Sequence, residues 1–250
     1  KIIPIEIDLD TNIPQSRGLG SSAACIVMGI IAAFSLMKRD LNKKEILKLA
    51  SKIESHPDNV SPAIFGGANA SILEDDKVYV EKFEISNNFK FLAIIPEFKL
   101  QTKDARSVLP TNYCKEDAVF NISRVSILIL SLISGDEENL KIALKDKIHQ
   151  PYRYKLIPEI EKIEKIIEES KALGHYLSGA GSIIMVILKS KDQSSEKEIR
   201  EKLENLSNQS NSDENKNEIE KLKKELEDFN KEKNYLQEKI NQSEKIIENL

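Results

Sequence analysis

The first 37 residues pass from an alternating pattern of side chains to a continuous apolar run. Apolar and charged residues alternate over Lys1–Asp10, which is the period of a half-buried strand. Cys25–Met37 is almost entirely apolar and follows two good helix formers, so we expect a buried helix with Cys25 as a buried thiol. The segment between them therefore forms the turn that joins a strand to the N-terminus of a helix.

Similar patterns predict most of the elements up to residue 190. Apolar stripes predict amphipathic helices over Leu41–Ile53 and Ile157–Leu173, the second of which ends at Gly174. Two apolar runs, Ala70–Leu73 and Val78–Phe83, flank a charged turn and predict a hairpin. We also expect strands over 91–96 and 183–188, and helices over 115–134 and 137–144, while residues 175–178 lead into a glycine-rich turn. Strands that alternate with helices, together with antiparallel pairing in the hairpin, favour the α+β class.

The pattern changes after residue 190. Residues 191–217 are polar and predict a linker, with a helix over Glu196–Leu206. From Ile219 to Leu250, ten positions recur at alternating spacings of three and four residues, and eight of them are apolar. This repeat favours a coiled-coil helix over 218–250. The alternative is a single solvated helix held by pairs such as Glu220 with Lys224.

Charge and cysteine content narrow the class of protein. Residues 191–250 carry 12 Lys and Arg against 16 Asp and Glu, which accounts for the whole net charge of −4. The remaining chain is balanced and has no basic stripe, which argues against a nucleic-acid partner. Two cysteines without metal-ligand spacing, and a start that lacks the apolar core of a signal peptide, indicate the cytoplasm. The apolar run of 15 residues at Ala23–Met37 is too short to span a bilayer, so we expect no membrane partner.

The turn before the first helix contains the sequence Gly18-Leu19-Gly20-Ser21-Ser22. A glycine-rich turn at a helix N-terminus collects unpaired backbone N–H groups and the positive end of the helix dipole, which favours a bound phosphate. The glycines allow close backbone approach, and the serine hydroxyls can cap the helix or reach a metal. The turn is not a Walker A loop, because no lysine follows Gly20. An ordinary strand-to-helix turn with a serine cap is the alternative.

Three segments resemble the motifs of the GHMP kinases, in the same order. Pro14–Ala24 resembles the central phosphate-binding motif, His56–Gly67 the substrate motif of the homoserine kinase branch, and Leu177–Ser182 the third, glycine-rich motif. The resemblance covers about residues 1–190. It implies a two-lobe α+β fold, with an N-terminal domain over 1–95 and a ferredoxin-like C-terminal domain over 96–190.

The resemblance implies ATP and Mg²⁺ as cofactors. Ser22 would hold the metal together with a carboxylate, for which Glu54 is the candidate because it ends the second helix just before the substrate motif. A surface helix residue is the alternative for Glu54. The residues that would bind the nucleotide are Pro14, Arg17, Gly18, Leu19, Gly20, Ser21, Ser22, Ala23, Gly179 and Gly181.

The implied substrate is an amino acid with a hydroxyl group. By resemblance, Asp58 would bind its ammonium group and Asn59 would contact the reacting hydroxyl. Thr102 and Arg106 lie in one matching segment and Arg153 in another, so the two arginines would bind the carboxylate. Whether Asp58 instead takes the hydroxyl proton stays open, and His149 has no assigned role.

The chain also departs from the family pattern. The family's first motif is absent and would precede Lys1, so we expect a chain truncated at its N-terminus. Ser182 and Ile183 replace the usual Pro-Thr of the third motif, and no final strand is recognisable where the coiled-coil tail stands. The expected activity is phosphorylation of the L-homoserine hydroxyl in threonine biosynthesis. One alternative is another GHMP kinase, such as a mevalonate-type enzyme. A second is a non-catalytic remnant whose coiled coil binds a partner or a second copy of the chain.

Overall fold

The computed structural model describes residues 6–40, 42–210 and 224. The chain divides into two compact units, Lys1–Lys197 and Glu198–Leu250. The predicted coiled coil over 218–250 lies outside the described residues except for Lys224. In the first unit, helices and two antiparallel sheets form an α+β fold.

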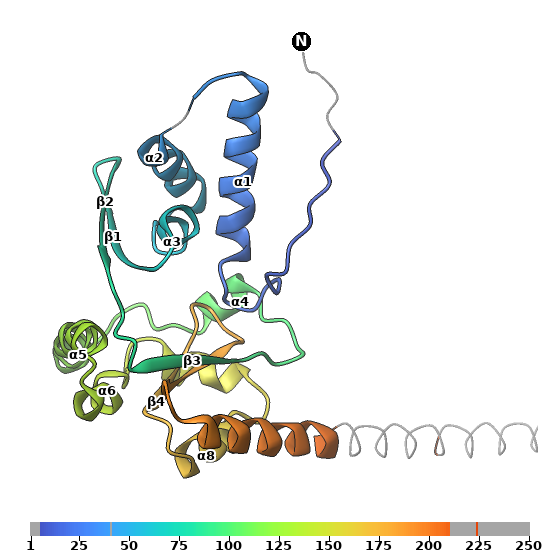
Figure 1. Cartoon of the computed structure of the whole chain (residues 1–250), viewed down its shortest axis with the longest axis vertical. Helices are drawn as coiled ribbons and strands as arrows, with labels where there is room; N and C mark the ends of the chain where they lie inside the picture. Colours follow the sequence, from blue (N-terminus) through green and yellow to red (C-terminus); the bar gives the residue numbers. More distant parts are fainter. Residues whose placement is uncertain (1–5, 41, 211–223, 225–250) are drawn as a thin grey trace, which may run out of the picture. The chain divides into compact units, whose positions relative to one another are not determined.

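Three helices and a hairpin build the first half of this unit (Figure 1). The helices α1 (Ser21–Leu36), α2 (Lys43–Glu54) and α3 (Val60–Phe65) share a core that includes Val27, Leu47 and Val60. The second helix begins with a capping box, because Asn42 accepts from the Glu45 N–H and the Glu45 side chain accepts from the Asn42 N–H. The positions predicted for α1 and α2 are confirmed to within a few residues. The prediction that α1 is a buried helix is wrong, because only Ala23 and Val27 are buried and Ile31 and Leu36 are exposed.

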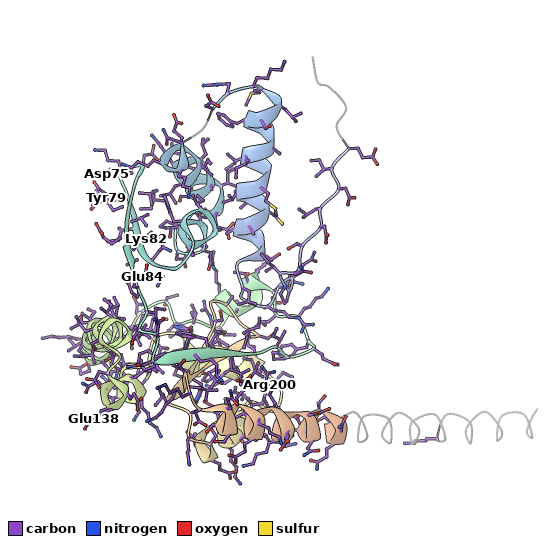
Figure 2. The ribbon with its side chains drawn as sticks, viewed as in Figure 1. Asp75, Tyr79, Lys82, Glu84, Glu138 and Arg200 are labelled. Atoms are coloured by element: carbon purple, nitrogen blue, oxygen red, sulfur yellow. The ribbon has the colours of Figure 1, made fainter. Side chains whose placement is uncertain are left out.

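The predicted hairpin is also confirmed. Strand β1 (Ala68–Glu74) pairs antiparallel with β2 (Lys77–Phe83), and Asp75 lies at the tip of the turn (Figure 2). Both turn residues, Asp75 and Asp76, have positive φ, as two-residue hairpin turns require. Lys82 points from β2 toward α3, where its Nζ donates to the carbonyl oxygen of Phe65 at 3.0 Å (Figure 2).

The strand predicted over Lys1–Asp10 does not form in its described part. Residues 6–10 have no regular structure, and the side chain of Ile7 is 81% exposed. A strand needs a partner for its backbone hydrogen bonds, and no described strand lies next to this segment in a sheet. The alternation of side chains was correct evidence for strand propensity, but pairing decides whether a strand exists.

The second half is built on a three-stranded sheet. Strands β3 (Phe89–Ile94), β5 (Ile184–Lys189) and β4 (Gly174–Leu177) lie in this order, with both pairs antiparallel. Among the described residues β3 pairs on one side only, so it is an edge strand, as expected if the family's final strand is missing from the sheet.

Helices follow the strand β3 along the chain. They are α4 (Thr102–Ser107), α5 (Lys115–Ser134), α6 (Glu137–Ala143), α7 (Gln150–Arg153), the 3₁₀ turn η1 (Tyr154–Leu156) and α8 (Ile160–Glu169). Leu140 of α6 packs with Phe89 and Ile187 of the sheet, and Leu128 and Leu132 of α5 pack against this cluster. A further helix covers 193–210 and is longer than the helix predicted over Glu196–Leu206.

Gly174 has a different role from the one predicted. It was expected to end a helix over Ile157–Leu173, but α8 ends at Glu169 and Gly174 begins β4. A Cβ atom on Gly174 would lie 2.5 Å from Cδ1 of Leu144, which is closer than real contacts allow. A larger residue at this position would therefore require the end of the Leu144 side chain to shift, and no local sequence signal reports this contact.

The helix α5 has the bounds that were predicted for it, 115–134, but many of its apolar side chains are exposed. Within the part of the chain that the structure describes, α5 alone is long and apolar enough to cross a membrane by length and composition. Only 6% of that apolar stretch is buried, and Ile122 and Leu130 are largely exposed. A single helix of this kind is weak evidence for a membrane protein, but the apolar run at Ala23–Met37 is not the longest in the chain.

Candidate active site

A cavity of about 820 Å³ brings together residues from the three motifs. The predicted site residues that line it share no single element: they come from the first loop, the ends of α1 and α2, α4, α7 and the β4–β5 loop. They are Arg17, Gly18, Gly20, Ser21, Ser22, Glu54, Asp58, Asn59, Thr102, Arg106, Arg153, Gly179 and Gly181. Of the predicted residues, Pro14, Leu19 and Ala23 do not line this cavity, and Ala23 is fully buried in the core beside α2.

Two glycine loops interlock on one wall of the cavity. The Ser178 Oγ donates to the carbonyl oxygen of Gly18 at 2.7 Å, and the Ile183 N–H donates to the carbonyl oxygen of Arg17 at 3.0 Å. Gly18 has a φ of +91°, and a Cβ atom there would lie 2.1 Å from the Ser178 carbonyl oxygen. The prediction that this glycine allows close backbone approach is confirmed, and the atom it approaches belongs to the third motif.

The first of these loops leads into α1 without a side-chain cap. Gly20 is the N-cap residue, with a φ of 71°, and no side chain accepts a hydrogen bond from the first turn. The first turn also contains no acidic residue that would compete with a bound anion. The backbone N–H groups at the start of this 16-residue helix are therefore available to a phosphate at the cavity.

The guanidinium group of Arg17 is used within the protein. It donates to the carbonyl oxygen of Pro96 and, at 2.5 Å, to that of Glu97. These bonds tie the first glycine loop to the segment that follows β3. Arg17 lines the cavity, but its charged group holds the loop in place.

Ser22 and Glu54 bring a hydroxyl and a carboxylate together at the cavity. The Ser22 Oγ donates to Oε2 of Glu54 at 2.9 Å, which joins the first turn of α1 to the last residue of α2. Hydroxyl and carboxylate oxygens suit a hard divalent cation. In the described ranges, no three His, Cys, Asp or Glu side chains gather as a complete metal site, so a cation here needs ligands from a bound phosphate or water.

Asp58 is linked to Arg106 through His56. Nδ1 of His56 contacts Oδ1 of Asp58 within hydrogen-bond distance, and Nη2 of Arg106 lies 2.8 Å from Nε2 of His56. Oδ1 of Asp58 also accepts from the N–H of Asn59 at 3.1 Å. The cavity therefore has an anionic and a cationic group separated by one imidazole ring. His56 lies in the segment His56–Gly67 that resembles the substrate motif, but no role was predicted for it.

Arg153 connects the helix α4 to the third motif. Its Nε donates to the carbonyl oxygen of Ala105 at 3.1 Å, and its Nη1 donates to that of Gly179 at 2.9 Å. Partial burial, followed by the nearby charge of Arg106, lowers the pKa of Arg153. The guanidinium group remains charged in spite of this. Two cationic groups close together make this end of the cavity attractive to a carboxylate or phosphate.

A half-buried carboxylate accepts hydrogen bonds from the backbone at the start of the helix that carries Arg153. Oδ2 of Asp146 accepts from the N–H groups of His149 and Gln150, both at 2.7 Å, and Asn121 donates to Oδ1. Burial raises the pKa of Asp146, but these hydrogen bonds outweigh it, so the pKa lies below its usual value. Burial lowers the pKa of His149, and its Nδ1 lies 3.4 Å from Nη1 of Arg153.

Cys25 is the clearest correction at the site. It was expected to be a buried thiol in the apolar helix, but it is exposed and lines the cavity. Its place one turn after Ser21 puts it on the open side of α1, which a uniformly apolar sequence does not reveal. Cys114 is also exposed, and its Sγ accepts the N–H of Asp117 at the start of α5.

Comparisons with known proteins agree with this arrangement. The GHMP kinases N terminal domain matches residues 2–67, and the GHMP kinases C terminal domain matches residues 128–209, beyond the expected end of the resemblance near residue 190. The homoserine kinase of Clostridium botulinum (strain ATCC 19397 / Type A) is 47% identical over 204 residues, which are 82% of this chain and 69% of that protein.

Solved structures share the fold. A crystal structure of homoserine kinase from Cytophaga hutchinsonii has a TM-score of 0.69 at 28% identity and covers 78% of this chain and 64% of that one. The Streptococcus pneumoniae phosphomevalonate kinase has a TM-score of 0.63 at 14% identity, with 77% of this chain and 68% of that one covered, and shows the fold alone. The chain thus spans about two thirds of the length of these relatives. Since the two matched domains each contribute one of the interlocked glycine loops, and 47% identity extends across both, the chain belongs to the GHMP kinase family.

Proposed function

We propose that this chain acts as a kinase that transfers the γ-phosphoryl group of ATP to the side-chain hydroxyl of L-homoserine. The observation that carries the proposal is the cavity itself. It joins a phosphate-type helix N-terminus to a paired anionic and cationic site of the kind that an amino-acid zwitterion requires. The 47% identity to the Clostridium botulinum homoserine kinase supports the choice of substrate.

The nucleotide would bind at the two glycine loops. The uncapped N–H groups after Gly20 and the close backbone approach of Gly18 to Ser178 support phosphate binding there. Ser21, Ser22 and the backbone near Gly179 and Gly181 would line the phosphates. Arg17 would act indirectly, by fixing the loop to the Pro96 and Glu97 carbonyls.

Ser22 and Glu54 would hold a Mg²⁺ ion against the nucleotide. Their oxygens already lie 2.9 Å apart, and Mg²⁺ is usually bound by one or two protein oxygens plus phosphate and water. The bound ion would supply neutralisation of the phosphate charge that grows during transfer. Glu54, the last residue of α2, would supply the negative charge that binds the ion, and its hydrogen bond with the Ser22 hydroxyl would orient its carboxylate.

The acceptor would be held by both of its charged ends. Asp58 would bind the α-ammonium group, and Arg106 and Arg153 would bind the α-carboxylate, with Thr102 beside them. Asn59, next to Asp58 on the cavity wall, would hold the hydroxyl toward the phosphates. Phosphoryl transfer depends mainly on placing the two oxygens in line and on stabilising charge, so this positioning is the principal contribution of the side chains.

The wider role follows from this reaction. Its product would be O-phospho-L-homoserine, which suits a step of threonine biosynthesis in the cytoplasm. We also propose that copies of the chain associate with each other, either through the kinase domains or through residues 218–250. A mevalonate-type substrate has a carboxylate but no ammonium group, so Asp58 would have no partner in it.

The test is product identification by ³¹P NMR with ATP, Mg²⁺ and either L-homoserine or mevalonate. The proposal expects a new phosphate-monoester signal with homoserine alone, accompanied by ADP. A signal with mevalonate alone would select the mevalonate-type alternative. Failure to bind ATP and Mg²⁺ in a calorimetric titration would instead favour a non-catalytic role.

A further inference from the structure

We propose that His56 is a positioning residue, held as the neutral Nδ1–H tautomer, which sets the separation between Asp58 and Arg106. It lies in the short connection between α2, which ends at Glu54, and α3, which begins at Val60. Its imidazole contacts Asp58 through one nitrogen and Arg106 through the other. The role of His56 in substrate selection rests on the proposed function, whereas its tautomer does not.

The chemistry of the two partners determines where the proton lies. A guanidinium group has donors only, so Nε2 of His56 must accept from Nη2 of Arg106 at 2.8 Å and carries no proton. An ionised carboxylate has acceptors only, so Nδ1 of His56 must donate to Oδ1 of Asp58. Both requirements are met by one tautomer of the neutral ring. A doubly protonated ring would lose the bond to Arg106.

The other two histidines of the chain have the opposite arrangement. Nδ1 of His149 faces Nη1 of Arg153 at 3.4 Å, so there the Nδ1 atom accepts and the proton belongs on Nε2. Nε2 of His175 faces Oε1 of Glu164 at 3.1 Å, so it too carries a proton on Nε2. His56 is therefore distinguishable from both by the nitrogen that carries hydrogen.

The bridge leaves most of each partner available. Apart from the bonds to His56 and to the Asn59 N–H, the described residues make no hydrogen bond to Asp58, so its Oδ2 remains for an ammonium group. Arg106 uses only Nη2 within the described chain, which leaves its Nη1 and Nε for a carboxylate. If the substrate is an α-amino acid, His56 thus fixes the distance between the groups that bind its two charges, and so selects for that spacing.

The tautomer is tested by ¹⁵N NMR of the imidazole rings. With ¹⁵N-histidine labelling the protein has three rings, and the signals lost in His56→Gln assign His56. We expect one ring with protonated Nδ1, assigned to His56, and two with protonated Nε2. Replacing Arg106 by Met should remove the preference of His56 for the Nδ1–H form. A His56 ring that carries its proton on Nε2, or on both nitrogens, in the wild-type protein overturns the proposal.

Substrate binding gives a second readout. In calorimetric titrations, His56→Leu should weaken L-homoserine binding by about tenfold to a hundredfold, as expected when bonds to charged groups are lost, with ATP affinity unchanged. His56→Gln should recover part of the loss, because an amide both donates and accepts. Equal loss for both ligands, or no recovery in the Gln variant, would indicate a merely structural role. Wild-type protein that shows the expected tautomer without homoserine binding would contradict the proposed function but uphold the bridge.

Discussion

A Cβ atom on Gly18 would lie 2.1 Å from the carbonyl oxygen of Ser178, a residue 160 positions later in the chain. This contact joins the two motifs at which a nucleotide would bind. Gly18→Ala should therefore force the loops apart and also place alanine at a φ of +91°, where non-glycine residues are strained. We expect a loss of stability of about 1–3 kcal/mol and a loss of ATP affinity, measured by chemical unfolding and calorimetric titration.

Gly29→Ala is the matched control. Gly29 lies in the interior of α1, and a Cβ atom there would meet no heavy atom within 4 Å. Alanine should stabilise the helix by up to about 1 kcal/mol and leave ATP affinity unchanged. If both glycine substitutions weakened ATP binding equally, the contact with Ser178 would not be the cause.

The pair formed by Ser22 and Glu54 should control the magnesium requirement. Glu54→Gln removes the charge but keeps the shape, so we expect the Mg²⁺ concentration at half-maximal rate to rise by about tenfold or more. Ser22→Ala should act in the same direction. The measurement is a Mg²⁺ titration of the initial rate at saturating ATP and homoserine.

Glu81→Gln serves as the control for that change. Glu81 is exposed on β2, outside the lining of the cavity, and loses the same charge. Its Mg²⁺ titration should match that of the wild-type protein. An equal rise in both variants would attribute the effect to net charge and not to a metal ligand.

Arg153 should contribute to stability as well as to substrate binding. Its Nε and Nη1 donate to the carbonyl oxygens of Ala105 and Gly179, so it holds α4 and the third motif together. A lysine in place of Arg153 cannot reach both carbonyl oxygens at once. Arg153→Lys should therefore lower the stability by about 1–3 kcal/mol and weaken the binding of both ATP and homoserine. Arg106→Lys should leave the stability nearly unchanged. Equal melting temperatures for the two variants would contradict this division of roles.

Acid should destabilise the protein through Asp146 and His149. Hydrogen bonds overcome burial to lower the pKa of Asp146, so its contribution is present above its ordinary value of 3.8 and is lost as the pH falls through the lower folded pKa. Burial lowers the pKa of His149, so below its ordinary value of 6.5 the unfolded chain binds a proton more readily than the folded one. Both effects therefore reduce stability as the pH decreases.

Melting temperatures between pH 7 and pH 3 test these signs. His149→Gln should flatten the decline that begins near pH 6.5, and Asp146→Asn should flatten the decline near and below pH 4. A melting temperature that rises on acidification over either range would contradict the assignment of the two groups.

Local sequence was sufficient where an element is defined by its own residues. The bounds of α5 follow from its apolar run, and the Asp75–Asp76 turn follows from turn chemistry. It was insufficient where a distant partner decides. Lys1–Asp10 has a strand pattern without a described partner strand, and the space for a side chain at position 174 is limited by Leu144. The His56 bridge likewise depends on Arg106, 50 residues away, which proximity in sequence could not indicate.

The most direct measurement of the central claim is the steady-state KM of Arg106→Ala for each substrate. One end of the cavity would bind the α-amino acid and the other end would bind ATP. Arg106, which is hydrogen-bonded to His56, belongs to the amino-acid end. The account predicts a KM for L-homoserine raised by about tenfold or more, with the KM for ATP within about twofold of the wild-type value. An equal rise in both constants, or an unchanged KM for homoserine, would contradict it.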